Sequence, residues 1–278
     1  MLIEPEALAA DPSCIVFDCR FSLTDKEAGR RSYEAGHIPG ARFADLERDL
    51  SAAPGERGRH PLPARDDLAE RLRAFGVGND SKVVCYDQNS GAVAARLWWL
   101  LRWLGHADVA VLDGGLDAWI AAGFRIDTEP VSPARGDFAP RDPLTRSRSA
   151  ADLTDGSRLL LDAREAARFR GESEPIDRVA GHIPGAVSAP FAGNLADGRF
   201  KPPEALGARF AALGVGPATD TVCYCGSGVT ATHNILALLV AGYPEPALYP
   251  GSWSEWIGDP DRPVETGEAQ VPAGRADV

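Results

Sequence analysis

The chain has 278 residues, of which 44% are hydrophobic and 25% are charged, a composition typical of a globular protein long enough for two domains. The formal net charge of −11 argues against nucleic acid or an anionic membrane surface as a partner, because both require a basic face. No apolar run is long enough to span a membrane and the N-terminus lacks the pattern of a signal peptide, so we expect a cytoplasmic protein.

The cysteines occur in a pattern that is typical neither of disulfide scaffolds nor of structural zinc sites. Their number is odd and no Cys-x-x-Cys pair is present, whereas disulfide frameworks pair their cysteines and zinc sites space their ligands closely. We therefore expect free thiols and no bound metal. The five are Cys14, Cys19, Cys85, Cys223 and Cys225.

Taken in chain order, short apolar runs alternate with longer segments in which apolar residues recur every three or four positions. Runs such as 159–163, 221–225 and 246–250 have the length of strands, and segments such as 204–215 and 231–243 have helical spacing. Strands that alternate with helices predict a parallel sheet flanked by helices. Ligands of such sheets bind beyond the carboxyl ends of the strands.

This order of elements occurs twice in the chain, because the sequences of its two halves match each other. The stretch AGHIPGA recurs letter for letter, and its histidines, His37 and His182, are 145 residues apart, whereas the matched Trp119 and Trp256 are 137 apart. So small a drift indicates a duplicated domain rather than a solenoid of short repeats. The matched stretches are 14–20 with 159–164, 35–41 with 180–186, 71–77 with 208–215, 83–87 with 221–225, and 113–120 with 250–257.

Residues 125–150 separate the two copies and are rich in proline and charge, without apolar periodicity. Such a composition predicts a linker. We therefore expect an α/β protein of two tandem domains, each a parallel sheet flanked by helices. The first domain is predicted to span residues 1–124 and the second residues 151–278.

Cys225 follows a predicted buried strand and opens the stretch CGSGVT, after which a helix is predicted. Backbone N–H groups converge at such a strand-to-helix loop, and the helix presents its positive end there. Both features favour the thiolate, which is the nucleophilic form of cysteine. Gly226 and Gly228 allow the backbone to approach the sulfur closely.

With these motifs the chain resembles the rhodanese family of sulfurtransferases. The resemblance covers both GHIPGA stretches, the arginine segment at Arg168, the cysteine loop and the Gly-Ser-Trp motif at 251–253. The CGSGVT loop is similar to that of 3-mercaptopyruvate sulfurtransferases, whereas thiosulfate-using relatives carry basic residues after the cysteine. The resemblance implies two rhodanese-like domains and a persulfide carried on Cys225. Asp87 occupies the matching position of the first copy and cannot form a persulfide, so the first domain is expected to be non-catalytic.

The resemblance also assigns substrate binding to arginines and to the loop. Arg168 and Arg178 are expected to hold the carboxylate of an α-keto acid, a task that suits the guanidinium group. They would also supply the local positive charge that an anionic substrate needs in a chain of net charge −11. The loop residues expected to contact the substrate are Gly226, Gly228, Val229 and Thr230.

A proton relay is implied in the same way. Ser227 is expected to pair with His37 of the first copy, and Asp25 is expected to orient that histidine. Such an arrangement can accept the proton of a substrate thiol while Cys225 attacks the sulfur. A purely structural role for His37 stays open, because its motif recurs in both copies.

The implied reaction has two steps and needs no metal or organic cofactor. Cys225 takes sulfur from 3-mercaptopyruvate and releases pyruvate, and the persulfide then passes its sulfur to an acceptor. The expected partners are a small-molecule sulfur donor and a thiol acceptor such as thioredoxin, or cyanide, with no nucleic acid and no membrane.

Other functions were weighed on the same residues. A cysteine phosphatase of the Cys-x5-Arg type would need an arginine where the chain has Ala231, so this function is set aside. A thiosulfate:cyanide sulfurtransferase differs only in its donor, and the neutral Gly226 and Ser227 favour a keto acid over a dianion. A non-enzymatic persulfide relay module would use Cys225 without the two arginines. Ion pairing is the alternative role for those arginines, since acidic residues flank them.

Overall fold

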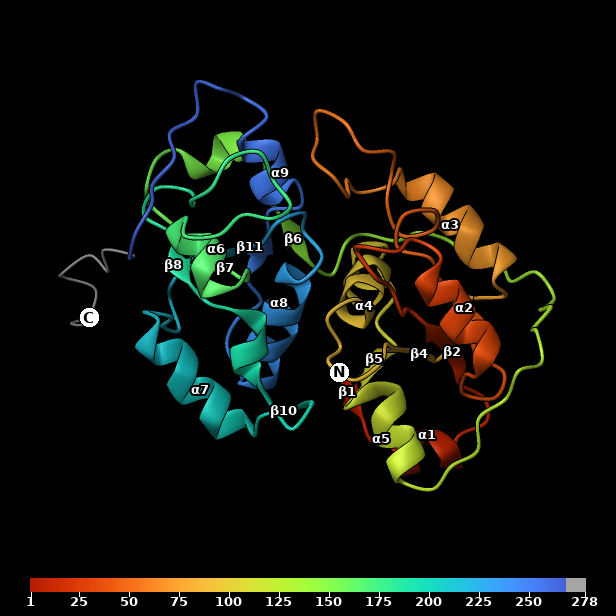
Figure 1. The fold of residues 1–278 in the computed structure, drawn as a ribbon. Coiled ribbons are helices and arrows are strands. Elements are labelled where there is room, and N and C mark those ends of the chain that lie inside the picture. Colours follow the sequence, from red (N-terminus) through yellow and green to blue (C-terminus); the bar gives the residue numbers. More distant parts are fainter. Residues whose placement is uncertain (269–278) are drawn as a thin grey trace. The chain divides into compact units, whose positions relative to one another are not determined.

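The structure, a computed structural model, describes residues 1–268 and falls into two compact units (Figure 1). The first unit comprises Met1–Ala52, Leu62–Thr145 and Asp197–Arg199. The second comprises Ala53–Pro61, Arg146–Ala196 and the described residues from Phe200 onward. Each unit therefore contains most of one sequence copy together with a short segment of the other.

Both units contain a five-stranded sheet, and the two sheets have the same arrangement. In the first unit the strands lie in the order β1 (Leu2–Ile3), β5 (Val109–Leu112), β4 (Val83–Tyr86), β2 (Ile15–Asp18) and β3 (Arg42–Phe43). In the second the order is β6 (Arg146–Ser147), β12 (Ala247–Leu248), β11 (Thr221–Tyr224), β7 (Leu159–Asp162) and β8 (Val187–Ser188). All of these neighbours pair in parallel, which confirms the predicted α/β fold of two parallel sheets.

Helices flank both sheets (Figure 1). Those of the first unit are α1 (Pro5–Ala10), α2 (Ala28–Ala35), α3 (Arg65–Ala74), α4 (Ala94–Trp103) and α5 (Gly115–Ala121). Those that follow are α6 (Ala166–Arg170), α7 (Pro203–Ala212), α8 (Ala231–Val240) and α9 (Ser252–Trp256), with 3-10 turns at Ala150–Leu153 and Phe191–Asn194 and a small sheet of β9 (Leu195–Ala196) and β10 (Arg199–Phe200). α4 packs on β4 and β5, and α8 packs on β11 and β12. Within the described residues, no helix has both the length and the hydropathy that crossing a bilayer demands.

Matching residues build the two hydrophobic cores, which explains why the sequence repeat is also a fold repeat. Tyr86 and Tyr224 are an example: each hydroxyl accepts the backbone N–H of the isoleucine of its own HIPG motif, at 3.2 and 3.3 Å. The matched core pairs include Val16 with Leu160, Ile38 with Ile183, Val84 with Val222, and Trp119 with Trp256.

The histidine of the repeated GHIPG motif has the same surroundings in both units. His37 Nδ1 lies 2.8 Å from the Tyr33 carbonyl oxygen, and His182 Nδ1 lies 2.8 Å from that of Phe169. Each imidazole also stacks on the ring of that same residue, with centroids 3.9 and 3.7 Å apart. Both histidines are buried. The motif therefore fixes a buried turn in each unit.

The segment predicted as a linker is divided between the units. Residues 125–145 belong to the first unit and contain no helix or strand. Backbone hydrogen bonds hold them there, from Gly136 N–H to the Arg73 carbonyl and from Arg141 N–H to the Leu104 carbonyl. Residues from 146 onward begin the second unit with β6.

Candidate active site

Cys225 directly follows β11, the middle strand of the second sheet. The first turn of α9 holds its backbone: the Ser252 hydroxyl accepts the Cys225 N–H at 3.1 Å, and the Trp253 N–H donates to the Cys225 carbonyl at 3.0 Å. The residue is only 2% exposed. The thiol is therefore fixed at the carboxyl end of the sheet, where parallel sheets bind their ligands.

The loop after β11 brings a backbone donor to the sulfur. The Gly228 N–H group lies 3.1 Å from Cys225 Sγ. Gly228 has a φ of +76°, and a Cβ at this position would lie 2.3 Å from the Pro250 carbonyl oxygen. Only glycine combines this conformation with so close an approach. The second glycine of CGSG is therefore required for the donor to reach the sulfur.

Val229 and Thr230 connect the loop to α8. The Val229 carbonyl accepts both the N–H group and the hydroxyl of Thr232, at 3.1 and 2.7 Å. Thr230 is the residue immediately before the helix. The amino end of α8, with its positive dipole, therefore lies directly after the cysteine loop.

Two guanidinium groups lie against Gly226, the residue after the cysteine. A Cβ on Gly226 would lie 3.0 Å from Arg59 Nη2 and 3.7 Å from each terminal nitrogen of Arg168. Arg59 belongs to the segment 53–61 and Arg168 to α6, and both are part of the second unit. We call these two residues, Arg59 and Arg168, the arginine clamp. An anion beside Cys225 would meet both guanidiniums.

Carboxylates position the arginine clamp. Arg168 donates to Glu174 at 2.7 to 3.1 Å and to Asp177 at 3.0 Å, and Arg59 donates to Asp177 at 2.6 Å. Burial alone would raise the pKa of Glu174, but the hydrogen bonds from Arg168 and from backbone N–H groups lower it below its usual value. Glu174 is therefore ionised and holds the Arg168 guanidinium in place.

The structure does not bring Arg178, the second predicted substrate arginine, to the cysteine loop. Its guanidinium donates to the carbonyl groups of Ile257 and Gly258. It lines a cavity of about 530 Å³ whose lining residues do not include the loop. Arg59 lies where we expected Arg178. The predicted pair, Arg168 and Arg178, is therefore corrected to Arg168 and Arg59.

Ser227 pairs with a histidine, but not with the one we predicted. Its hydroxyl oxygen lies 2.8 Å from His60 Nδ1, and both residues are buried. His60 follows Arg59 in the segment 53–61, and the Arg59 N–H group ties this segment to the Ser254 hydroxyl at 3.0 Å. One short segment thus supplies both a clamp arginine and the histidine.

The residues predicted to complete the relay, His37 and Asp25, belong to the first unit and are engaged there. The ring nitrogens of His37 lie 2.8 and 3.2 Å from the carbonyl oxygens of Tyr33 and Glu129. Asp25 is exposed and forms an ion pair with Arg31. The predicted pairing of Ser227 with His37 is therefore corrected to His60, because the GHIPG turn uses the His37 ring.

The repeat contains a signal for this segment that our motif comparison left unused. Residues 58–60, Gly-Arg-His, align with residues 198–200, Gly-Arg-Phe. Residues 53–61 of the first copy belong to the second unit, and residues 197–199 of the second copy belong to the first unit. There Arg199 pairs with Glu4 at 2.6 Å. The two matched segments differ at their third residue, which is His60 in the first and Phe200 in the second, and only the histidine can exchange a proton.

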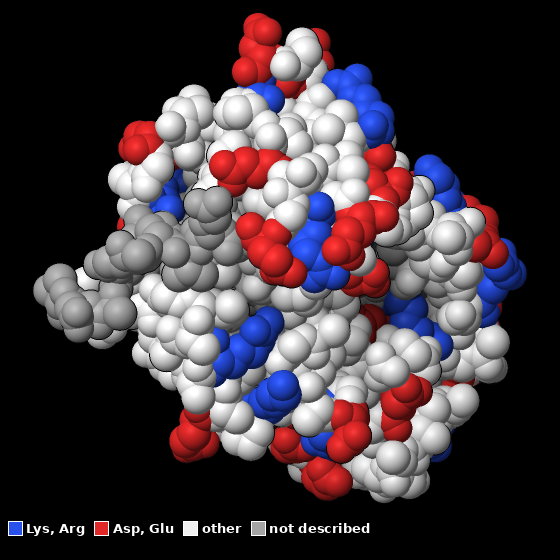
Figure 2. Space-filling view, turned by 60° about the vertical axis from the view of Figure 1, so that its left-hand side comes forward, with Lys and Arg blue, Asp and Glu red and all other residues white. Residues whose placement is uncertain are grey.

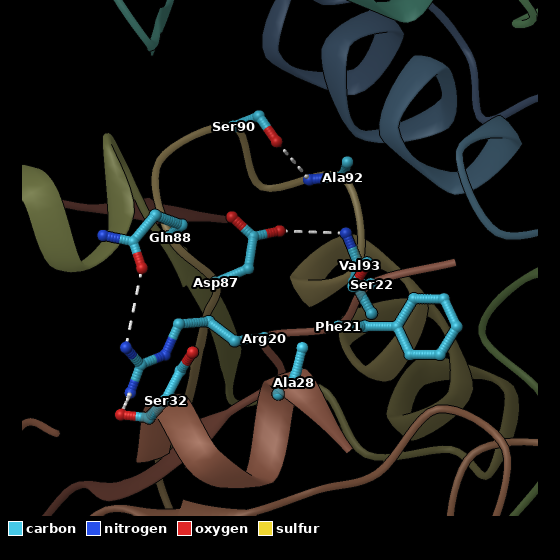
Figure 3. Close-up of a pocket in the computed structure, with 11 residues that line it drawn as sticks. Arg20, Phe21, Ser22, Ala28, Ser32, Asp87, Gln88, Ser90, Ala92 and Val93 are labelled. Atoms are coloured by element: carbon cyan, nitrogen blue, oxygen red, sulfur yellow. Dashed lines mark hydrogen bonds between the residues drawn. The ribbon is translucent and has the colours of Figure 1, made fainter. Parts of the chain in front are cut away.

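In the first unit, the position that matches Cys225 carries Asp87, whose carboxylate is bound by its own loop (Figure 3). It accepts the N–H groups of Gly91, Val93 and Ala94 at 2.8, 2.9 and 3.3 Å. A cavity of about 300 Å³ lies beside it, lined by residues that include Arg20, Ser32 and Gln88. In Figure 3 the Arg20 guanidinium reaches Gln88 and the Ser32 carbonyl, so it is already occupied by protein groups.

The other four cysteines are poor candidates for a nucleophile. Cys19, Cys85 and Cys223 are fully buried, and burial raises the pKa of Cys19 and of Cys223. Burial also raises the pKa of Cys14. All five cysteines are free thiols, as predicted. A thiol whose pKa is raised by burial is a poor nucleophile. Cys225 is the candidate, because its loop combines a backbone donor to the sulfur with two arginines against Gly226.

One face of the molecule gives no general reason for an anion to bind. On the face shown in Figure 2, basic side chains are scattered among acidic ones and do not merge into a continuous basic patch. The formal net charge of −11 repels anions as a whole. The guanidinium N–H groups of the arginine clamp are therefore the donors that an anion beside Gly226 would meet.

The two parallel sheets and the single cysteine loop define the class of protein. Residues 4–122 and 146–259 match the family described as Rhodanese-like domain, and the chain belongs to this family. The match confirms the resemblance inferred from the repeated motifs. It also confirms that the domain occurs twice.

Several named relatives match almost the whole chain. It is 54% identical to the "Probable 3-mercaptopyruvate sulfurtransferase" of Pseudomonas aeruginosa, over 96% of this chain and 98% of that protein. It is 44% identical to SseB of Mycobacterium tuberculosis, provisionally named a thiosulfate sulfurtransferase, over 94% of this chain and 93% of that protein. The solved 3-mercaptopyruvate sulfurtransferase from Leishmania major has a TM-score of 0.83 at 32% identity, covering 93% of this chain and 74% of that one. The names include two sulfur donors, so the donor has to be argued from the site.

Proposed function

We propose that this chain is a sulfurtransferase that takes sulfur from 3-mercaptopyruvate as a persulfide on Cys225 and passes it to a thiol or to cyanide. The observation that carries the proposal is one loop that combines a thiol, the Gly228 N–H donor and the arginine clamp. Relatives named 3-mercaptopyruvate sulfurtransferase support the same reaction.

The arginine clamp binds the donor's carboxylate. Two guanidiniums offer several N–H groups in a geometry that suits a carboxylate. Gly226 allows the Arg59 guanidinium to lie close to the cysteine loop, because a side chain there would meet it. Val229 and Thr230 contribute through the amino end of α8, whose positive potential favours an anion.

The first step forms a sulfur–sulfur bond and breaks a carbon–sulfur bond. The Cys225 thiolate attacks the sulfur of the donor, and the electron pair of the broken bond stays on the carbon of the departing pyruvate. The proton of the donor's thiol ends on that carbon, which becomes the methyl group of pyruvate. Atoms and charge balance without an oxidant, because one persulfide anion replaces one thiolate.

Ser227 and His60 move that proton. Ser227 lies in the cysteine loop, two residues after the nucleophile, and its hydroxyl is hydrogen-bonded to His60 of the segment 53–61. Histidine commonly acts as a general base by taking a proton from a hydrogen-bonded hydroxyl group. His60 takes over the role that the sequence assigned to His37, and the relay does not involve Asp25.

The second step returns Cys225 to the thiolate. A thiolate or cyanide attacks the outer sulfur of the persulfide, the sulfur–sulfur bond breaks, and the electron pair returns to Cys225. The acceptor that we propose is a cytoplasmic thiol such as that of thioredoxin. No metal or organic cofactor takes part in either step.

Thiosulfate is the second candidate donor, and the name of the Mycobacterium tuberculosis relative favours it. Thiosulfate carries two negative charges, and basic residues next to the cysteine would suit it. Here the two residues after Cys225 are the neutral Gly226 and Ser227. The arginines of the clamp are partly neutralised by Glu174 and Asp177, so the keto acid is the better fit.

Steady-state kinetics with both donors and one acceptor test this function. We expect pyruvate release from 3-mercaptopyruvate, with a kcat/KM higher than that for thiosulfate. Faster turnover of thiosulfate would contradict the donor assignment. Turnover of neither donor would favour a persulfide relay module that is loaded by another protein.

A further inference from the structure

Asp177 joins the two members of the arginine clamp. Its Oδ1 atom accepts a hydrogen bond from Arg59 Nη1 at 2.6 Å, and its Oδ2 atom accepts one from Arg168 Nη2 at 3.0 Å. The Asp177 side chain is 5% exposed. Because the carboxylate is shielded from solvent, salt screens its interactions with the arginines only weakly.

The charges of this cluster balance. The two guanidiniums of the clamp face two carboxylates, those of Glu174 and Asp177. Arg164 also contacts Glu174, at 3.4 Å, but it is paired with Asp162 at 2.6 Å. The formal charges therefore sum to zero, although guanidinium nitrogens of the clamp still face the cysteine loop.

A cluster with directed N–H donors and little net charge distinguishes anions by their charge. A singly charged carboxylate gains the hydrogen bonds of the clamp. The Coulomb attraction that a net positive charge exerts is twice as large for a dianion as for a monoanion. A neutral cluster withholds this extra attraction, so it favours a keto acid over thiosulfate.

We propose that Asp177 is a positioning residue that sets the donor preference: by bridging and neutralising the arginine clamp, it selects a singly charged carboxylate donor over the doubly charged thiosulfate. The inference rests on the proposed function of Cys225 and extends it to a residue that does not touch the donor. Glu174 carries the same charge but is a less suitable target, because its carboxylate also binds the backbone N–H groups of Ile176 and Asp177.

The test replaces Asp177 and compares two donors on the same enzyme. Asp177→Asn removes the charge at nearly constant size, Asp177→Glu restores it, and Glu172→Gln is the matched control. Glu172 pairs with Arg170 on the surface. In Asp177→Asn we expect the ratio of kcat/KM for thiosulfate to that for 3-mercaptopyruvate to rise about tenfold, through KM. The ratio should stay at the wild-type value in Glu172→Gln and return toward it in Asp177→Glu.

A merely structural role for Asp177 predicts that both donors lose rate together, with an unchanged ratio, and that result would overturn the inference. If Asp177→Asn does not fold, Asp177→Ser removes the same charge and has the same expected ratio. The wild-type protein is measured first. Transfer from neither donor by the wild type would overturn the proposed function, and the inference with it.

Discussion

The loop after β4 and the loop after β11 share one backbone feature but differ in the side chain that it contacts. Each contains a glycine of positive φ, Gly91 at +73° or Gly228 at +76°, whose N–H group is directed at the side chain where the strand ends. In the first loop this side chain is Asp87, and its carboxylate accepts three N–H groups. In the second it is Cys225, and its sulfur accepts the Gly228 N–H group.

This difference shows what the fold supplies and what individual residues add. The fold supplies a strand-to-helix loop with converging N–H donors in both units. In the first loop, Asp87 occupies those donors with its own negative charge, so they are not available to a bound anion. In the second, Cys225 Sγ accepts the Gly228 N–H group, and the arginine clamp and His60 lie beside the loop.

The largest effect is expected from the nucleophile itself. Cys225→Ser should lower kcat/KM for 3-mercaptopyruvate by about 10⁴-fold or more, because a hydroxyl cannot accept sulfur as a persulfide. The measurement is pyruvate release. Cys14→Ser is the control, because Cys14 lies in the first unit and should leave the rate unchanged. Residual wild-type turnover in Cys225→Ser would place the chemistry on another thiol.

The next largest effect should distinguish His60 from His37. His60→Asn is expected to lower kcat with 3-mercaptopyruvate about 100-fold, because the proton relay through Ser227 is lost. The loss should be smaller with thiosulfate, which has no thiol proton to move. His37→Asn should lower the thermal unfolding temperature, since its ring holds the GHIPG turn, but it should not lower the rate per folded molecule. A loss of rate in His37→Asn, with none in His60→Asn, would instead support the His37 relay that the sequence predicted.

A third comparison uses two arginines of the same short helix, α6. Arg168→Gln should raise KM for 3-mercaptopyruvate so that kcat/KM falls roughly 30-fold, the effect of losing a charge-assisted hydrogen bond of about 2 kcal/mol. Arg170→Gln removes an exposed arginine that pairs with Glu172. It should leave both constants unchanged. Equal effects of the two substitutions would mean that Arg168 acts only through general charge.

The smallest effect concerns the pH dependence of stability at Asp87. Burial raises the pKa of Asp87, although hydrogen bonds from Val93 and Gly91 oppose this. Its stabilising contribution is therefore present at pH below the usual aspartate pKa and is lost as pH rises through the raised value. Asp87→Asn removes the titration, so its stability relative to wild type should increase with pH. Urea unfolding of both proteins from pH 4 to pH 7 measures this difference, and a difference that falls with pH would contradict the account.

The repeat allowed much of the fold to be predicted. For example, the matched stretches 83–87 and 221–225 contain β4 and β11. These two strands occupy equivalent places in two sheets that have the same strand order. Periodicity reveals such elements because each strand and helix buries one face locally. Residues 125–145 were less predictable. They contain no regular structure, and backbone hydrogen bonds hold them in the first unit.

The site was predictable only in part, because its parts come from distant places in the chain. The CGSGVT loop and Arg168 were found by their own motifs. His60 lies 167 residues from Ser227, and no local pattern reports that Ala53–Pro61 belongs to the second unit. The resemblance assigned the relay to His37, yet the letter-for-letter recurrence of its GHIPG stretch is what a shared structural turn produces.

The location of the transferred sulfur tests the central claim most directly. Reduced protein is incubated with 3-mercaptopyruvate without an acceptor and digested without reductant, and the peptides are mapped by mass. We predict a gain of one sulfur atom on the peptide that contains Cys225, with release of pyruvate, and no gain on the peptides of the other four cysteines. Sulfur on any other cysteine, or none on Cys225 despite pyruvate release, would contradict the account.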